Sequence, residues 1–212
     1  MNSSLLDQLH FGQAADILVP SLVHGASLVI ETTIIGFLLA MIVGTLIAVG
    51  RLFAWRPFKV LLYSFLELIR GTPLLVQLVY IYYVVPLIIN LICGLFGYHT
   101  NVQISPIVAG IAGLAVNYGC YMSEVIRGGI ISIDNGQTEA SICLGFSPFE
   151  TLWRIILPQA IRSIIPALGN YLVMMIKDTS LLAYVAVNEL LLRTQTFASQ
   201  TFLTIEAYTY LA

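Results

Sequence analysis

The feature that most constrains this chain is a run of 53 residues, Gly71 to Ser123, without a single Asp, Glu, Lys or Arg. A second uncharged run extends for 19 residues from Thr32 to Gly50. A helix crosses the hydrocarbon core of a bilayer with about 20 apolar residues, so the longer run has room for two crossings joined by a turn. Charged residues make up 9% of the chain, and the mean hydropathy is +0.92. The sequence therefore predicts an integral membrane protein.

The apolar runs are continuous and show no alternation of polar and apolar residues, so they predict helices and not the strands of a membrane barrel. We expect an all-α bundle of about five transmembrane helices in a single domain, residues 1–212. The expected spans cover residues 22–49, 61–91, 104–123, 164–187 and, as a partial fifth helix, 204–212. Gly71, Pro73 and Pro86 lie within the second span and predict a kink or break there. The nine residues from Thr204 to Ala212 are too few to cross the bilayer, so we expect either that the chain is truncated or that this fifth helix stays partial.

The basic residues of the connecting segments predict the orientation of the chain. Those between the first two spans and between the third and fourth are Arg51, Arg56, Lys59, Arg127, Arg154 and Arg162. The opposite side has only Arg193, and residues 1–20 contain no Lys or Arg. Both basic connections are therefore expected in the cytoplasm and the N-terminus outside. Because that N-terminus lacks the basic start of a secretory signal, the first span is expected to be retained.

Residues that would indicate catalysis or metal binding are missing from the sequence. Cys93, Cys120 and Cys143 are spaced for packing and not for a metal site. The only two lysines, Lys59 and Lys177, follow Phe and Ile, so no phosphate-binding G-x-x-x-x-G-K loop exists. We expect no catalytic residue, no metal or cofactor bound by this chain, and no nucleic-acid partner.

Residues 127–163 form a connection that is long for a helical bundle and has its own punctuation. Asn135-Gly136 is typical of a turn. Thr138 to Leu144 can form two helical turns, which Gly145 would end in a left-handed conformation. Ser147-Pro148-Phe149-Glu150 is a capping box that begins a second short helix. Its apolar stripe is predicted at Phe149, Leu152, Trp153 and Ile156.

Helices this short cannot cross a bilayer and are marginal in isolation, so they must pack on something. One alternative is an interfacial hairpin on lipid headgroups, but such a helix usually has several Lys or Arg on its polar face. This segment mixes Glu139, Glu150 and Arg154 instead. The other alternative is a docking surface for a soluble partner.

The register of this segment favours docking. The segment from Glu139 to Pro158 resembles the coupling-loop signature of the permease subunits of ATP-binding-cassette (ABC) importers, which reads E-A-A, three residues, G, nine residues and I-x-L-P. The matching positions are Glu139-Ala140-Ser141, Gly145 and Ile155-x-Leu157-Pro158. Ser141 departs from the pattern by a small-for-small exchange. The resemblance implies that residues 139–158 dock with a separate ATPase, which binds ATP and magnesium and receives the first short helix in a groove. The residues implied in coupling are Glu139, Ala140, Ser141, Gly145, Phe146, Leu157 and Pro158.

Charges at membrane depth indicate a second site, because ionisable groups there are expensive and often functional. Arg70 in the second span and the pair Lys177-Asp178 in the fourth fall near mid-depth. The stretches 70–77 and 176–181 resemble the polar-amino-acid branch of these importers. The expected substrate path contains Arg70, Gln77, Lys177, Asp178, Thr179, Ser180 and Glu189.

Structural alternatives exist for the same charges. Glu67 and Arg70 have the spacing of a pair within one helix, and Asp178 can instead pair with Lys177 or with Arg70 of a neighbouring subunit. Glu124 and Arg127 are expected to pair at the end of the third span. A zwitterionic amino acid needs both a cation and an anion in a low-dielectric cavity, and these helices supply one of each.

The sequence thus predicts a membrane-spanning subunit of an ABC importer that moves a polar amino acid across the bacterial inner membrane. The resemblance implies four kinds of partner: ABC ATPase subunits, an extracytoplasmic amino-acid-binding protein, a second permease subunit in a homo- or heterodimer, and membrane lipid. Alternatives are an ion- or proton-coupled secondary transporter, which usually has inverted repeats that this chain lacks, and a scaffold that recruits a soluble partner. The amino acid and the kind of dimer are left open.

Overall fold

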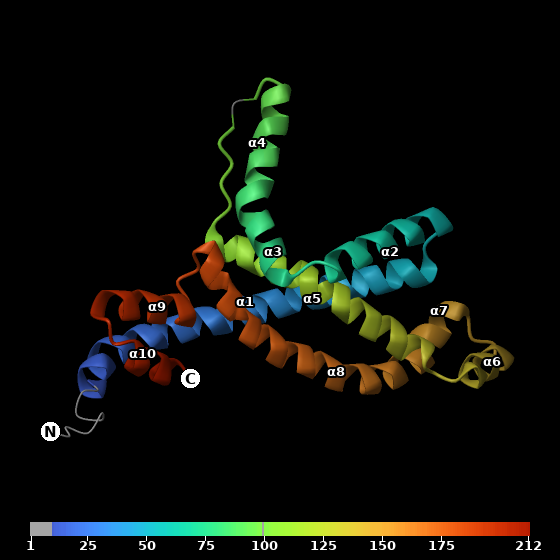
Figure 1. Ribbon diagram of the computed structural model, residues 1–212. Coiled ribbons are helices and arrows are strands. Elements are labelled where there is room, and N and C mark those ends of the chain that lie inside the picture. The colour runs from blue at the N-terminus through green and yellow to red at the C-terminus, as the bar shows by residue number, and fades with distance from the viewer. Residues whose placement is uncertain (1–9, 99) are drawn as a thin grey trace. The chain divides into compact units, whose positions relative to one another are not determined.

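The computed structural model describes residues 10–98 and 100–212, and within these it contains helices and no strand (Figure 1). The α-helices are α1 (Phe11–Phe53), α2 (Arg56–Arg70), α3 (Leu74–Val79), α4 (Val85–Leu95), α5 (Pro106–Ile131), α6 (Asn135–Cys143), α7 (Pro148–Glu150), α8 (Leu157–Asp178), α9 (Leu190–Thr201) and α10 (Thr204–Leu211). Two π-helical segments, Tyr80–Val84 and Thr151–Ile156, and a 3₁₀ segment, Thr179–Val185, continue these helices. The all-α prediction is confirmed.

Three helical stretches among the described residues are long and apolar enough to cross a membrane: Phe11–Phe53, Leu74–Leu95 and Pro148–Val185. Helix α5 covers most of the predicted span 104–123 and has 26 residues, but it falls outside this set. The predicted partial span 204–212 is the eight-residue helix α10. The number of crossings therefore stays a prediction.

The predicted span 61–91 is not one continuous helix. Helix α2 ends at Arg70, Gly71 follows, and a new helix begins at Leu74. Pro73 has no N–H to donate and disfavours helical geometry at the residue before it, so the chain breaks where Gly71 and Pro73 predicted. The apolar stretch Leu74–Leu95 is a separate element.

Each π-helical segment ends two residues before a proline, which is the second residue of the next α-helix. The segment Tyr80–Val84 precedes Pro86, and Thr151–Ile156 precedes Pro158. A proline ring clashes with the carbonyl four residues earlier. The wider π-helical turn changes that spacing, and the helix continues through the proline without a break.

Contacts divide the chain into two units. The first contains the described residues of Met1–Ile35, Leu78–Ile111 and Ile176–Ala212. In it, Ala14 and Leu18 of α1 share a core with Phe197 and Ala198 of α9 and with Ala207 of α10. Helix α10 therefore packs on the start of α1.

Polar contacts hold further segments of the first unit in place. The Glu206 carboxylate accepts a 2.9 Å hydrogen bond from the backbone N–H of His10. The Asn90 side chain accepts from the N–H of Val102 at 2.7 Å and donates to its carbonyl at 3.1 Å. The extended segment before α5 is thereby tied to α4.

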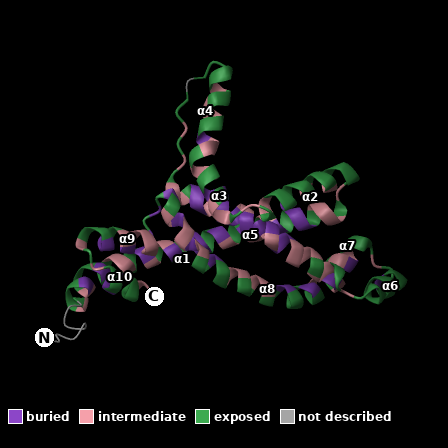
Figure 2. Ribbon diagram, viewed as in Figure 1, coloured by how far each residue is buried: buried purple, intermediate pink, exposed green. Residues whose placement is uncertain are grey.

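The second unit contains Gly36–Gln77 and Ala112–Met175. Helices α1 and α5 pack closely at Gly44, because a Cβ atom on this residue would lie only 2.9 Å from the carbonyl oxygen of Gly119 in α5. Ile47 of α1, Leu66 of α2 and Cys120 of α5 form a buried cluster. Figure 2 shows that much of α2 and α8 is exposed, and many of these exposed side chains are large and apolar, as lipid-facing helices require.

Candidate functional site

The hairpin, defined here as residues 134–158, begins with a capped helix. The Asp134 carboxylate accepts a 2.7 Å hydrogen bond from the N–H of Gly136, and α6 starts at Asn135. The prediction of a separate turn at Asn135-Gly136 is therefore wrong. An aspartate N-cap supplies an acceptor for the unpaired N–H groups of a first helical turn, and this outweighs the turn preference of Asn-Gly.

The end of α6 and the start of α7 have the geometry that the sequence predicts. Gly145 adopts φ +82°, and the N–H of Phe146 returns to the carbonyl of Ser141 at 3.0 Å. The Ser147 hydroxyl accepts from the N–H of Glu150 at 3.3 Å, while the Glu150 carboxylate accepts from the N–H of Ser147 at 3.1 Å. The left-handed stop and the capping box are both confirmed.

These bonds also set the charge state of Glu150. The backbone N–H of Ser147, and then its hydroxyl, hold the pKa of the Glu150 carboxyl below its ordinary value of 4.5. A carboxylate that accepts hydrogen bonds is favoured over the protonated acid. The capping box is therefore fully formed near neutral pH.

A buried hydroxyl pair joins the two halves of the hairpin. Ser141 in α6 is 1% exposed and Thr151 in the π-helical segment is 4% exposed. Their side-chain oxygens lie 2.8 Å apart, and Ser141 also donates to the carbonyl of Thr138 at 2.7 Å. Ser141, the residue that departs from the importer signature, thus makes the side-chain contact that joins α6 to the π-helical segment.

Several large apolar side chains of the hairpin are exposed. Ile142 is 61% exposed, Leu144 76%, Phe149 69% and Trp153 58%. Glu139, Ala140 and Pro158 are exposed, and Phe146 and Leu157 are half-buried. Apolar patches on a polar segment mark interaction surfaces. These exposed apolar side chains are therefore available to a partner.

The predicted stripe of the second short helix is split. Ile156 is buried, whereas Phe149 and Trp153 are exposed, because the π-helical turn changes the angle between successive side chains. An apolar cavity of about 440 Å³ lies on the side of Ile156. Residues of the α5–α6 region and of this segment line it, among them Ile130, Ile142 and Leu152.

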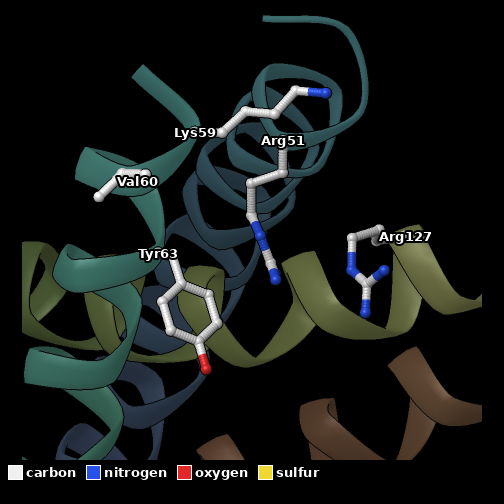
Figure 3. A pocket seen from close by; sticks show the side chains of 5 residues that line it. All are labelled: Arg51, Lys59, Val60, Tyr63 and Arg127. Atoms are coloured by element: carbon white, nitrogen blue, oxygen red, sulfur yellow. The ribbon is translucent and has the colours of Figure 1, made fainter. Parts of the chain in front are cut away.

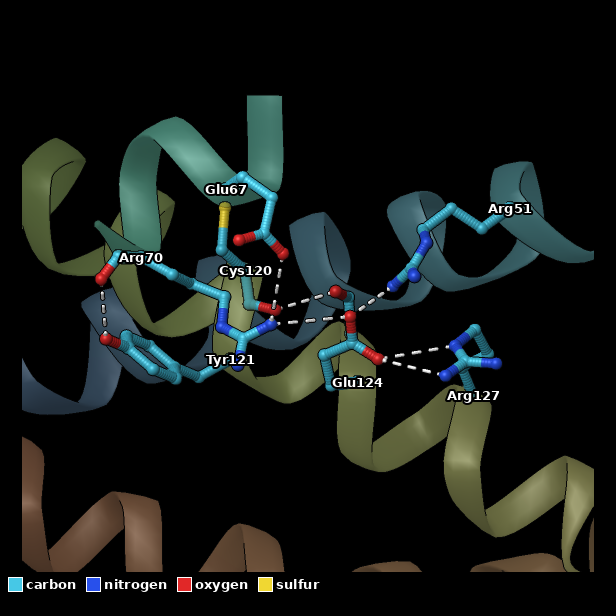
Figure 4. Close-up of polar contacts among 8 residues, drawn as sticks. Arg51, Glu67, Arg70, Cys120, Tyr121, Glu124 and Arg127 are labelled. Carbon is cyan, nitrogen blue, oxygen red and sulfur yellow. Dashed lines mark hydrogen bonds and ion pairs between the residues drawn. The ribbon is translucent and has the colours of Figure 1, made fainter. Parts of the chain in front are cut away.

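A second feature of the same unit is the carboxylate of Glu124, which contacts three arginines (Figure 4). Arg51 lies 2.5 Å from it, Arg127 3.2 Å and Arg70 3.5 Å. The expected local pairs Glu124–Arg127 and Glu67–Arg70 are present, the latter at 3.9 Å. Both belong to this larger network, which sequence spacing within one helix cannot reveal.

A cavity of about 330 Å³ lies beside this network (Figure 3). Its lining residues are Arg51, Lys59, Val60, Tyr63 and Arg127. The Arg51 guanidinium lies 5.8 Å from the centre of the Tyr63 ring, and Lys59 donates to the carbonyl of Leu52 at 2.9 Å. The cavity is thus predominantly cationic.

Gln77, expected in the substrate path, closes the break between α2 and α3. Its amide nitrogen donates to the carbonyls of Ile69 at 2.6 Å and Thr72 at 3.0 Å. Its oxygen accepts from the Asn117 amide at 3.1 Å. These bonds satisfy carbonyls that the helix break leaves unpaired. Arg70 is likewise engaged, since its guanidinium also lies 5.6 Å from the Tyr121 ring centre.

The other expected path residues belong to the first unit, where α8 tightens into the 3₁₀ segment. The Thr179 hydroxyl donates to the carbonyl of Ile176 at 2.6 Å, and the Ser180 hydroxyl donates to that of Lys177 at 2.9 Å. Thr179 is buried, Asp178 and Ser180 are half-buried, and Lys177 is exposed. Arg70 belongs to the second unit.

Glu189 has a structural contact of its own. Its carboxylate caps α9 by accepting from the N–H groups of Leu191 at 2.8 Å and Leu192 at 2.9 Å. Burial raises the pKa of this carboxyl, although the hydrogen bonds from Leu191 and Leu192 lower it in part. No group of His, Cys, Asp or Glu among the described residues is arranged to hold a metal ion.

Comparison with known proteins decides the family. The model of the family described as "Binding-protein-dependent transport system inner membrane component" matches residues 36–212. The chain belongs to this family of ABC importer permeases. Its homologues are transport components and not enzymes.

Relatives of this permease include amino-acid transporters. The glutamine transport system permease protein GlnP of Escherichia coli strain K12 is 34% identical over 195 residues, which are 92% of this chain and 84% of that protein. The L-cystine transport system permease protein TcyB of Bacillus subtilis strain 168 is 38% identical over 176 residues, 83% of this chain and 70% of that one. The chain is thus an amino-acid ABC importer permease subunit.

A solved structure has the same fold. The crystal structure of an amino acid ABC transporter with histidines matches with a TM-score of 0.82 and 30% identity, covering 96% of this chain and 89% of that one. This similarity supports the helical importer fold and disfavours the secondary-transporter and scaffold alternatives.

Sequence reasoning missed Thr151 and Asn117 as structural residues, since Gln77 and Asn117 are 40 residues apart and the Ser141–Thr151 contact depends on how the two short helices pack. Asp134 could have been found, because Asp immediately before a helical stretch is a standard N-cap signal.

Proposed function

We propose that this permease imports a polar amino acid and that a separate ATPase drives it by docking on the cytoplasmic hairpin. The observation that carries the docking proposal is the exposure of four large apolar side chains of the hairpin, Ile142, Leu144, Phe149 and Trp153. The chain has no phosphate-binding loop, so ATP and magnesium belong to the partner. The proposed coupling residues are Glu139, Ala140, Ser141, Gly145, Phe146, Leu157 and Pro158.

The rigidity of the hairpin supports this role. The Ser141–Thr151 contact and the capping box fix α6 against the segment that continues into α8. A force applied to α6 would therefore pass to α8 without being absorbed by a flexible loop. Transmission of ATP-driven closure into a membrane helix requires such a connection.

Leu144→Asp tests docking directly, because it places a charge at the most exposed of these apolar side chains, which is 76% exposed. Thr204→Asp adds the same charge at the exposed first residue of α10 and is the matched control. Each variant is purified from membranes that contain the complete transporter, and the amount of co-purified ATPase and ATP-dependent uptake are measured. We expect Leu144→Asp to lose both and Thr204→Asp to retain both. ATPase retention in Leu144→Asp would contradict the proposal.

The proposed substrate path includes Asp178, Thr179 and Ser180 at the transition from α8 to the 3₁₀ segment. Their position at a change of helix type is typical of transporter sites, where irregular backbone lines a cavity. Arg70 forms ion pairs with Glu67 and Glu124, so we do not propose that it binds the carboxylate of the substrate. An extracytoplasmic binding protein and a second permease subunit complete the proposed transporter.

Asp178→Asn tests the substrate role. Uptake per correctly assembled complex is measured for the wild type and for this variant, with ATPase co-purification as the control for assembly. Loss of one partner of a buried polar pair costs several kcal/mol, so we expect a normalised uptake at least about tenfold lower. Unchanged normalised uptake with reduced abundance would assign Asp178 a purely structural role.

The proposed orientation places the hairpin in the cytoplasm of a bacterial cell and the N-terminus outside. In a background without the three cysteines, Gln137→Cys and Thr100→Cys offer exposed labelling positions. We expect an impermeant thiol reagent to label position 100 in intact cells and position 137 only after membrane disruption. The reverse pattern would overturn the orientation.

A further inference from the structure

The cavity beside Glu124 carries more positive charge than the protein neutralises. Arg51, Arg70 and Arg127 share the carboxylate of Glu124, and Arg70 also lies 3.9 Å from Glu67. Lys59 makes no ion pair with any described residue, and its ammonium donates to a backbone carbonyl. Three cations, Arg51, Lys59 and Arg127, thus line a cavity of about 330 Å³, and Glu124 is the one carboxylate among the described residues that pairs with them. This leaves an excess of two positive charges at the cavity.

The donors that line the cavity suit a phosphate group. Arg127 uses its Nε and one terminal nitrogen on Glu124, so its second terminal nitrogen remains for another acceptor. An ammonium offers three donors, of which Lys59 uses one on Leu52. Figure 3 shows the Arg51 guanidinium and the Tyr63 ring extending in the same direction, whereas the Lys59 ammonium extends toward the last turn of α1, where Leu52 accepts its hydrogen bond. Guanidinium and ammonium groups together bind phosphate oxygens strongly.

The position of the cavity along the chain fits the headgroup level of a bilayer. The uncharged run of α1 ends at Gly50, and Arg51 follows immediately. Helix α2 then begins with Lys59 in its first turns and continues through exposed apolar residues, among them Leu61 and Leu68. Trp55 is 72% exposed and Tyr63 53% exposed, and such aromatic residues concentrate at membrane interfaces.

We propose that this cavity binds the phosphate headgroup of an anionic phospholipid, whose acyl chains lie along the exposed apolar face of α2. The cationic lining binds the phosphate. The side chains of Val60 and Leu61, which are 65% and 63% exposed, contact the part of the acyl chains nearest the headgroup. A free phosphate ion would satisfy only the cationic lining. This proposal is independent of ATPase docking and of the transported substrate.

Tryptophan quenching by brominated lipid tests the proposal with the full chain in vesicles. The chain has two Trp, and Trp153→Phe leaves Trp55, whose carbonyl accepts from the N–H of Lys59, as the single reporter. Quenching by brominated phosphatidylglycerol is compared with that by brominated phosphatidylcholine at the same mole fractions. We expect preferential quenching by the anionic lipid.

Two substitutions in the same helical turn distinguish a site from a diffuse surface charge. Lys59→Gln removes a cavity cation, and Arg56→Gln removes an exposed cation outside the cavity lining. We expect Lys59→Gln to weaken the preference for phosphatidylglycerol about fivefold, Lys59→Arg to restore it and Arg56→Gln to leave it nearly unchanged. Circular dichroism checks that helix content is retained, and Lys59→Met serves as a second neutral variant.

Three outcomes would overturn the proposal. Equal losses in Lys59→Gln and Arg56→Gln would reduce the effect to general surface charge. An absence of preference for the anionic lipid would remove the site. Complete displacement of the lipid by millimolar inorganic phosphate would assign the cavity to a free anion in place of a membrane lipid.

Discussion

The hydroxyl oxygens of Ser141 and Thr151 lie 2.8 Å apart in a buried contact that joins α6 to the π-helical segment before α8. Thr151 has no other side-chain hydrogen bond within the described residues. Ser141 stands where the importer signature has alanine. The exchange therefore comes with a matched hydroxyl elsewhere in the hairpin.

Ser141→Ala is expected to destabilise the hairpin although it restores the residue of the signature. The Thr151 hydroxyl would stay buried without a partner, at a cost of about 1–3 kcal/mol. The double variant Ser141→Ala/Thr151→Val removes both polar groups and should recover most of that loss. Amide hydrogen exchange in α6 measures the local stability of the three proteins. Additive losses in the double variant would contradict the coupling.

Glu124→Gln is expected to destabilise the second unit, because three arginines lose their shared anion and repel one another. We expect the Tm of the detergent-solubilised protein to fall by roughly 5 °C, measured by loss of helical circular dichroism. Glu67→Gln is the matched control, since the side chain of Glu67 is 54% exposed and lies 3.9 Å from Arg70. It should change the free energy of unfolding by less than about 0.5 kcal/mol. Similar shifts in both variants would refute the network.

Gly145→Ala is expected to weaken the end of α6 through backbone strain alone. A Cβ atom at this position would meet nothing within 4 Å, but φ is +82°, a conformation that costs an L-residue about 1–2 kcal/mol. Gly145→Asn should cost less, because Asn tolerates the left-handed region. Hydrogen exchange at the last amides of α6 gives the comparison. Equal protection in the alanine variant and the wild type would show that the turn relaxes.

The capping box of α7 is expected to weaken in acid. Because the folded-state pKa of Glu150 lies below its ordinary value of 4.5, its contribution to stability is complete above that ordinary value and is lost as the pH falls through the folded-state pKa. Amide exchange of Ser147, corrected for intrinsic rates, should accelerate in that window. Glu150→Gln removes the titrating group, and its exchange should be independent of pH there. A pH response that persists in Glu150→Gln would assign the effect to another group.

Local sequence signals predicted several elements correctly because each depends on neighbouring residues. The break near Gly71 and Pro73, the stop at Gly145 and the capping box of Ser147 and Glu150 all follow from backbone preferences within a few positions. Competing local signals were harder to rank, and at Asn135 the Asp134 cap prevailed over a turn.

The sequence by itself determined a helical membrane protein and, through the register from Glu139 to Pro158, its importer family. Composition and backbone preference act locally, so they can be read along the chain. Only the tertiary structure decided that Glu124 gathers three arginines, that Gln77 meets Asn117 and that Ser141 meets Thr151. Each of these contacts joins helices through packing, and a buried polar group takes whichever partner the packing brings within hydrogen-bond distance.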